Sequence, residues 1–251
     1  MALIDCDFYS ETLGMPASVI VILPRQSGPE LRGTRHPVLT LLHGLSDDHT
    51  VWLRQTAIER YAVAHGLAVV MPNVHRSFCA DMKAGPHYWT FLSEELPEVT
   101  RDFFPLSQKR EQNFVAGLSM GGYGAFKLAL RRPDMFAAAA SLSGVMDAAA
   151  MFHEEGEDWH RELATIFGSA DELRGGGADL FALATNVAAS KTRPKLYQCC
   201  GASDPLLEEN RRFRSHAKRL KLPLTYREGP GGHTWEYWDT MIERVVKWLP
   251  S

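Results

Sequence analysis

The pentapeptide at residues 117–121 (GLSMG) places a serine between two glycines. This spacing matches the nucleophile elbow, a sharp strand-to-helix turn that exposes a serine hydroxyl. A motif this short also arises by chance. Here it follows an apolar run at residues 113–116 and precedes a helical pattern rich in small residues, the setting that an elbow requires. We predict that Ser119 is a nucleophile; the alternative is a glycine-rich turn whose serine only caps a helix.

A serine hydroxyl needs a base and an orienting acid, and in this kind of site they follow in the order Ser, Asp or Glu, His. Of the ten histidines, only His216 and His233 lie beyond the last predicted central strand. His216 falls on the basic face of a predicted helix, whereas His233 follows a glycine-rich loop that can present it over the edge of a sheet. We predict His233 as the base; the alternative is a loop histidine that caps a helix.

The orienting acid is predicted at Asp204, directly after the apolar run at residues 195–200. Loops at the carboxyl ends of strands carry the functional groups of open α/β sheets. Because Pro205 follows it, Asp204 also reads as an ordinary helix N-cap. Glu228 and Asp239 fall inside a predicted strand and a predicted helix, where neither is well aimed at His233.

Acyl transfer also needs two backbone amides that stabilise an oxyanion. The residue after the nucleophile, Met120, is expected to supply one amide. The other is expected from Leu45, because His43 and Gly44 follow the apolar run at residues 38–42 and glycine permits a sharp turn there. On its own, this dipeptide would indicate only a turn.

These residues need a sheet to position them, and the hydrophobic pattern predicts one. Short apolar runs typical of strands buried on both faces occur at residues 19–23, 38–42, 67–71, 114–117, 137–142 and 196–200, and residues 224–227 are expected to form a final strand. Helical spacing occurs at residues 56–65, 88–104, 120–131, 206–220 and 234–249. This alternation predicts an α/β fold with a mainly parallel sheet and right-handed crossovers.

Two segments depart from the alternation. The first 24 residues contain a turn signal at Gly14, Met15 and Pro16, which predicts an antiparallel hairpin at the edge of the sheet. Residues 145–193 are rich in alanine and acidic residues, and we expect a small helical insertion over the carboxyl edge. No internal repeat or linker is evident, so residues 1–251 are predicted to form a single domain.

The composition limits which binding partners and which cellular compartment are expected. The chain has 251 residues, 45% hydrophobic and 23% charged, with a formal net charge of −3. A core of this size needs neither disulfides nor a structural metal. The slightly negative net charge gives no indication of a positively charged surface that would bind nucleic acid or acidic membranes. Asp5 and Asp7 interrupt any signal-peptide pattern, and no apolar run reaches 18 residues. The four cysteines form neither a disulfide framework nor a zinc spacing, so a cytoplasmic location is expected.

The motifs resemble those of the esterase D group of α/β-hydrolases, most closely the bacterial tributyrin-esterase-like carboxylesterases. The resemblance spans nearly the whole chain and rests on Trp52 and on residues 42–45, 88–97, 117–122 and 231–239. It implies an α/β-hydrolase fold, with a mostly parallel central sheet and helices on both faces. It also implies a Ser119, Asp204 and His233 triad with Leu45 and Met120 as oxyanion donors. S-formylglutathione hydrolases are close relatives, but their usual His-Gly-Leu-Thr-Cys reads His-Gly-Leu-Ser-Asp at residues 43–47.

We therefore expect a serine carboxylesterase that hydrolyses short-chain acyl esters of small molecules without a cofactor, as a monomer or homo-oligomer. Thioester hydrolysis of the S-formylglutathione type, acyl transfer and a non-catalytic binding protein are the alternatives. Trp52 and Trp89 are candidates for the walls of the acyl pocket, although a core role fits them equally. Residues 153–160 lack a metal-ligand spacing, so no metal is assigned. Trp235 and Trp238 begin the packing stripe of the last helix.

Overall fold

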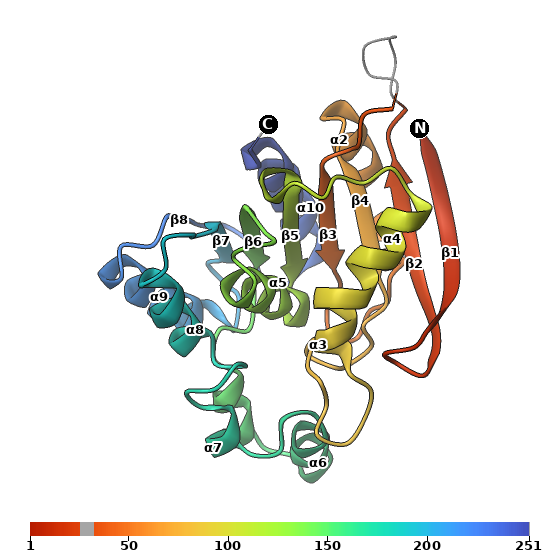
Figure 1. Ribbon diagram of the computed structural model, residues 1–251. Helices are drawn as coiled ribbons and strands as arrows, with labels where there is room; N and C mark the ends of the chain where they lie inside the picture. The colour runs from red at the N-terminus through yellow and green to blue at the C-terminus, as the bar shows by residue number, and fades with distance from the viewer. Residues whose placement is uncertain (26–32, 251) are drawn as a thin grey trace.

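The structure, a computed structural model, describes residues 1–25 and 33–250 (Figure 1). Its centre is an eight-stranded sheet with the order β1-β2-β4-β3-β5-β6-β7-β8. Among the strand pairs of the described residues, β1–β2 and β2–β4 are antiparallel and the others are parallel. The strands are β1 (Ala2–Ser10), β2 (Met15–Leu23), β3 (Val38–Leu42), β4 (Ala68–Pro72), β5 (Asn113–Leu118), β6 (Ala138–Leu142), β7 (Lys195–Gly201) and β8 (Leu224–Gly229).

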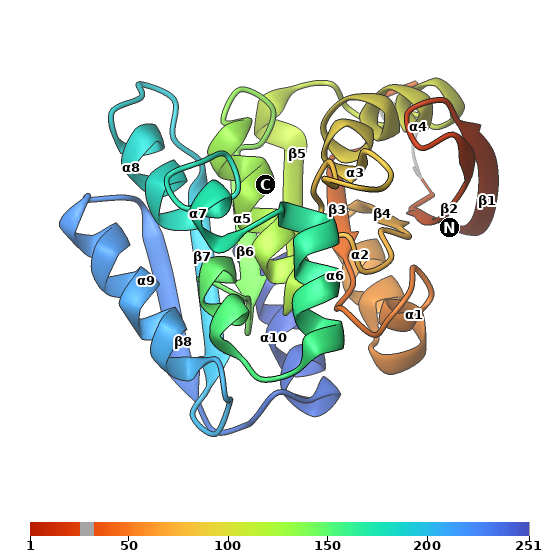
Figure 2. The ribbon, with the colours of Figure 1, turned by 90° about the horizontal axis from the view of Figure 1, so that it is seen from below.

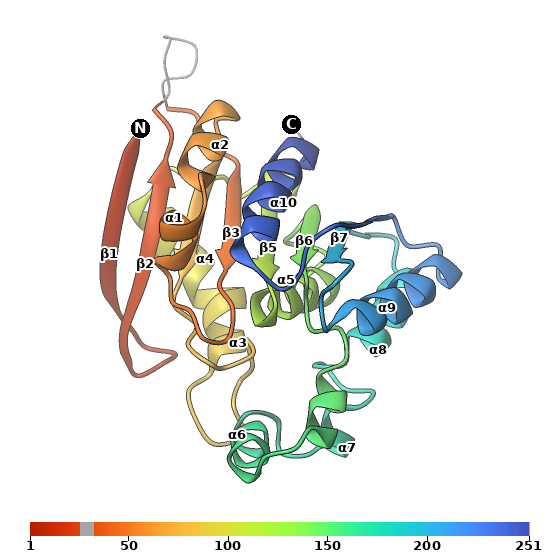
Figure 3. The ribbon, with the colours of Figure 1, turned by 180° about the vertical axis from the view of Figure 1, so that it is seen from behind.

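Helices cover both faces of the sheet (Figures 1 and 3). The helical segments outside residues 143–194 are α1 (Val51–Gln55), α2 (Ile58–Ala64), α3 (Tyr88–Thr90), η2 (Phe91–Glu95), α4 (Leu96–Phe103), η3 (Arg110–Gln112), α5 (Met120–Arg131), α9 (Leu207–Arg219) and α10 (Trp235–Trp248). Figure 3 shows α1, α2 and α10 together on one face. The opposite face carries α4, α5 and α9 (Figure 1). The mostly parallel α/β fold predicted from the sequence is therefore confirmed.

The two cores follow the two-residue period of the strands. In β4, Ala68 and Val70 pack into the core beneath α5, while Val69 and Met71 pack into the core beneath α2 and α10. All four side chains are buried. Burial on both faces explains why the parallel strands appear in the sequence as continuous apolar runs.

The N-terminal hairpin is present, but its turn lies earlier than the sequence predicts. Gly14, with φ of 67°, closes the turn by donating from its amide to the Ser10 carbonyl at 2.9 Å. Met15 and Pro16 already belong to β2, where Pro16 pairs with Tyr9 of the edge strand. The sequence pattern predicts a turn residue at Pro16, but a proline is tolerated here because it is the second residue of β2 and lies before the part of β2, residues 19–22, that pairs with β4.

Residues 145–193 contain four helical segments, η4 (Ala148–His153), α6 (Glu157–Phe167), α7 (Ala170–Leu173) and α8 (Leu180–Ala188). Figure 2 shows α6 crossing in front of the sheet when the molecule is seen from below. Helix α8 instead packs against α5 on the face of the sheet. The part of the expected insertion that projects beyond the carboxyl edge is therefore η4 to α7.

Candidate active site

Ser119 occupies a strained turn between β5 and α5. Its φ is 52° and its ψ is −120°, a conformation that L-residues rarely adopt. The turn is closely packed: a Cβ atom at Gly121 would lie 2.5 Å from the carbonyl oxygens of Leu42 and His43, and one at Gly117 would overlap the Gly121 backbone. The two glycines of the motif are thus needed for the close approach of β3, β5 and α5.

The structure brings Ser119, His233 and Asp204 into one hydrogen-bonded row. His233 Nε2 lies 3.1 Å from Ser119 Oγ, and His233 Nδ1 lies 3.1 Å from Asp204 Oδ2. The loops after β7 and β8 meet through backbone bonds, including Ser203 N–H to the Gly231 carbonyl at 2.9 Å. The Asp204 side chain is fully buried, whereas the His233 ring is 29% exposed. This arrangement lets the imidazole accept a proton from the serine while the carboxylate fixes its orientation.

A second layer of hydrogen bonds supports Asp204. Trp238 Nε1 donates to the Ser143 hydroxyl at 3.1 Å, and the Trp238 ring packs edge-on against His233 with centroids 4.8 Å apart. Burial opposes ionisation of Asp204, but hydrogen bonds from His233, Ser143 and the Leu206 amide outweigh it and hold the pKa of this carboxyl below its ordinary value. Asp204 is therefore ionised at neutral pH and stabilises a protonated imidazole.

Ser143 and the polar role of Trp238 were not predicted. Ser143 follows β6 with φ of 47°, and a serine at a strand end is too common to be noticed in a sequence. Trp238 was correctly placed in the packing stripe of the last helix, but its periodicity gives no information about its indole N–H.

The turn after β3 is held by His43, which is fully buried. His43 Nδ1 lies 2.7 Å from the Gly44 carbonyl, and His43 Nε2 accepts the Val74 amide at 3.0 Å. Desolvation lowers the pKa of His43, so the ring is neutral, with Nδ1 as donor and Nε2 as acceptor. In the described part of the chain, the amides of Leu45 and Met120 have no hydrogen-bond acceptor. Both remain available to a ligand.

The residues considered as alternatives to His233 and Asp204 bind other parts of the molecule. His216 Nε2 lies 3.0 Å from the Phe181 carbonyl, between α8 and α9. Glu228 binds Arg211, and Asp239 accepts hydrogen bonds from the Ala57 amide and the Tyr61 hydroxyl. None of the three carboxyl or imidazole groups contacts Ser119 or His233.

A cavity of about 680 Å³ opens beside the turn after β3. Leu45, Ser46 and Asp47 form one wall, the loop after β4 forms another, and Glu162 and Ile166 of α6 close the third side. Because Leu45 belongs to this wall, a group held by its amide would face the cavity. The cavity therefore borders the turn after β3, whose Gly44 is close to Ser119, while Ser119 and His233 are not among the residues that line it.

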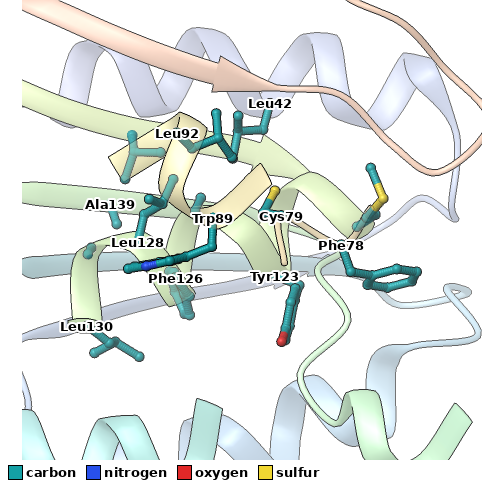
Figure 4. Packing of buried hydrophobic residues seen from close by; sticks show 14 of the residues in the cluster. Leu42, Phe78, Cys79, Trp89, Leu92, Tyr123, Phe126, Leu128, Leu130 and Ala139 are labelled. Carbon is teal, nitrogen blue, oxygen red and sulfur yellow. The ribbon is translucent and has the colours of Figure 1, made fainter. Parts of the chain in front are cut away.

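Trp52 and Trp89 do not line this cavity, so the interpretation of both as pocket walls is wrong. Trp52 is fully buried on the other face of the sheet, where its Nε1 donates to the Leu42 carbonyl at 3.1 Å. Trp89 lies in the core beside Leu128 and Phe126 (Figure 4), with the Arg131 guanidinium stacked 3.7 Å from its ring centroid. An aromatic residue near a strand end can face either the site or the core, and the burial of Trp52 and Trp89 shows that both face the core.

The insertion is tied to the loop after β4. Arg76 binds Glu162 through two hydrogen bonds of 2.5 and 2.8 Å, and the Lys83 ammonium lies 2.7 Å from Glu172. The amides of Lys83 and Ala84 donate to the last carbonyls of α6 at 3.1 and 3.0 Å. These contacts hold α6 over the cavity. None of the helices in residues 1–25 and 33–250 has both the length and the apolar character needed to cross a bilayer.

Comparison with known proteins identifies the family. The family model Esterase matches residues 10–249. An acetyl esterase from Caldicellulosiruptor saccharolyticus is 31% identical over 265 residues, which cover 99% of this chain and 98% of that protein. FphF of Staphylococcus aureus, a fluorophosphonate-binding serine hydrolase in its substrate-bound structure, has a TM-score of 0.93 and 38% identity, covering 100% of this chain and 98% of its own.

A second structure from the same organism, the S-formylglutathione hydrolase FrmB without ligand, has a TM-score of 0.89 and 38% identity, covering 100% of this chain and 99% of its own. The matches extend over the sheet, the elbow and the loops that carry Asp204 and His233. The chain therefore belongs to the Esterase family and is an ester hydrolase with the α/β-hydrolase fold.

Proposed function

We propose that this enzyme hydrolyses short-chain carboxyl esters with Ser119 as nucleophile, His233 as base and Asp204 as the orienting acid. The contact that carries the proposal is the 3.1 Å approach of His233 Nε2 to Ser119 Oγ, with Asp204 on the other ring nitrogen. His233 takes the hydroxyl proton as Ser119 Oγ attacks the ester carbonyl carbon. The tetrahedral intermediate then collapses, and the leaving alkoxide takes that proton and departs as the alcohol.

The negative oxygen of the intermediate is assigned to the amides of Leu45 and Met120. Both are free of intramolecular acceptors among the described residues, and His43 holds the turn that aims the first of them. Preorganised amides of this kind contribute on the order of 10²–10³ in turnover per donor. In the second half of the reaction, water attacks the acyl-enzyme with His233 again as base, and the carboxylic acid leaves.

Replacement of the nucleophile tests this proposal directly. Ser119→Ala removes the attacking oxygen while adding nothing to the crowded turn, so turnover of an acetate ester should fall on the order of 10⁴-fold or more. The wild-type protein should also gain one fluorophosphonate adduct by intact mass, and the variant none. Retained turnover in a folded, pure variant would contradict the assignment of Ser119, and the adduct excludes a non-catalytic binding protein.

Thioester hydrolysis is the second candidate, because FrmB, 38% identical along the chain, is described as an S-formylglutathione hydrolase. The same acyl-enzyme chemistry serves both reactions, so only the leaving group distinguishes them. Comparing kcat/KM for S-formylglutathione and a simple acetate ester decides between the two. Acyl transfer to an alcohol would in addition appear as a transesterified product when ethanol is present.

The finer assignments are proposals as well. A preference for short acyl chains, as in tributyrin, is supported by the fixed position of α6 and by the acetyl esterase relative. Four free cysteines among the described residues support a cytoplasmic location. We retain residues 1–251 as one domain, supported by the single continuous sheet, and leave the oligomeric state to a sizing experiment.

A further inference from the structure

Asp47 places a carboxylate in the cavity wall close to the reacting serine. A Cβ atom at Gly44 would lie 2.9 Å from Asp47 Oδ2 and 3.8 Å from the Ser119 Cβ. The carboxylate and the nucleophile thus flank the same glycine of the turn. Asp47 also lines the cavity beside Leu45, whose amide is assigned to the oxyanion.

The other charged side chains that line the cavity, Arg76 and Glu162, neutralise each other. Arg76 is neutralised by the two hydrogen bonds that it makes to Glu162. Asp47 has no ion-pair partner within the described residues, and Arg54 acts on it only through space. The cavity therefore has one uncompensated negative charge at the end nearest the serine.

A carboxylate at this position opposes catalysis of a neutral ester. It repels the negative oxygen that forms a few ångströms away, and it is itself partly desolvated, since burial raises the pKa of Asp47. Both penalties fall when a cation of the bound substrate pairs with the carboxylate. The turn itself is closed by the Asp47 amide, which donates to the Gly44 carbonyl at 3.2 Å; the Gly44 backbone amide also acts on the Asp47 carboxylate and lowers its pKa, but by less than burial raises it.

We propose that the cavity selects esters whose alcohol part carries a cationic ammonium group, with Asp47 as its charge partner. This inference rests on the proposed function and extends it to the leaving group. A short acyl chain leaves most of the 680 Å³ for the alcohol. Alcohols and thiols with net negative charge, glutathione among them, are disfavoured by the same carboxylate.

Three acetate esters of similar size test the selection: acetylcholine, its neutral isostere 3,3-dimethylbutyl acetate, and the anion 4-acetoxybutanoate. At low ionic strength, kcat/KM should be at least about tenfold higher for the cation than for the anion. The ratio should shrink in 0.5 M NaCl, because salt screens a partly exposed charge. In Asp47→Asn, the ratio should fall to about threefold or less.

Two further variants sharpen the test. Glu162→Gln removes one charge of the Arg76 pair and should improve kcat/KM for the anionic ester relative to the neutral one. Asp158→Asn is the matched control, because Asp158 lies on the same helix, pairs with Arg161 and is exposed away from the cavity; the ratio should not change.

The outcomes separate the two proposals. An active enzyme with equal kcat/KM for all three esters, or a cation preference that persists in Asp47→Asn, would overturn the charge selection and leave the triad intact. Absence of both hydrolysis and fluorophosphonate labelling would overturn the proposed function itself.

Discussion

The conformation of Ser119 has to be maintained against a cost of about 1–3 kcal/mol for its left-handed backbone. Backbone bonds from two directions maintain it. The Ser119 amide donates to the Leu142 carbonyl of β6 at 3.0 Å, and the Ser119 carbonyl accepts from the Tyr123 and Val145 amides at 3.0 and 3.3 Å. The nucleophile is therefore fixed by the sheet and by α5 together, and the strain cannot relax by a local movement.

The indole of Trp238 offers a test of how far this rigidity extends beyond the triad. Trp238→Phe keeps an aromatic ring against His233 but removes the donor to Ser143, which in turn supports Asp204. The hydrogen bond contributes about 1 kcal/mol, so kcat should fall roughly fivefold while KM stays nearly constant. Steady-state kinetics on one acetate ester measures both values.

Trp235→Phe is the control, because Trp235 packs edge-on against Trp238 with centroids 5.2 Å apart and its indole makes no hydrogen bond among the described residues. If both variants lose kcat equally, the effect of Trp238 is packing and the polar chain to Asp204 has no separate role.

Individual elements explain what the sequence could predict. Continuous apolar runs predicted β3 at its observed bounds, and β4 to β7 within one or two residues, because a strand buried on both faces must be apolar throughout. The approach of Asp204 to His233 followed from the same logic, since both loops leave the carboxyl ends of adjacent strands.

Other features depend on contacts between distant segments. The predicted helix at residues 88–104 contains a π-helical turn at Phe91–Glu95, and Glu95 binds the hairpin turn through the Glu11 amide at 2.8 Å. No local pattern encodes that contact. For the same reason, the sequence could not decide whether Trp52 faced the cavity or the core, and it could not reveal the Ser143–Trp238 bond.

Helix α9 contacts the first residues of the insertion through the carboxyl group of Glu209. Glu209 accepts the Met146 amide at 2.8 Å, and burial, more than the nearby Asp147, raises the pKa of Glu209 to about 7. Between its ordinary value of 4.5 and 7, the folded state holds a proton that the unfolded state has released. Stability is therefore lost as the pH rises through this window, and the loss is complete above pH 7.

Glu209→Gln removes this titration and keeps an acceptor for the Met146 amide. Relative to the wild type, the variant should gain stability at pH 8 but not at pH 4.5. Because Glu209 is partly exposed, we expect the free energy of unfolding at pH 8 to rise by only about 1 kcal/mol, which corresponds to ~2–4 °C in Tm. Thermal unfolding at both pH values measures it. Glu208→Gln, an exposed neighbour paired with Arg211, is the control and should show no such pH-dependent gain; an equal gain there would attribute the effect to the net charge of the helix.

At the scale of the whole molecule, the sheet and the insertion together bound the space that a substrate can use. The parallel strands present the serine, the acid and the histidine at one edge, and α6 closes that edge from outside (Figure 2). Exposed ion pairs such as Lys83 with Glu172 contribute less than about 1 kcal/mol each. The backbone hydrogen bonds from Lys83 and Ala84 attach α6 directly to the loop after β4.

A fixed α6 predicts a short acyl chain, because the cavity of about 680 Å³ must hold the alcohol as well. Each methylene that fits contributes at most about 0.8 kcal/mol, whereas one that does not fit adds strain of about 1–3 kcal/mol. For p-nitrophenyl esters, kcat/KM should peak at about two to four acyl carbons and fall at least about tenfold by eight, since 1.4 kcal/mol is already a factor of ten. The double variant Glu162→Gln with Glu172→Gln removes the two ion pairs that join the insertion to Arg76 and Lys83 of the loop after β4, and should shift the profile toward longer chains. A wild-type profile that is flat or rises through decanoate would show that the insertion opens as a lid during turnover, and Ser119 labelling would be unaffected by that result.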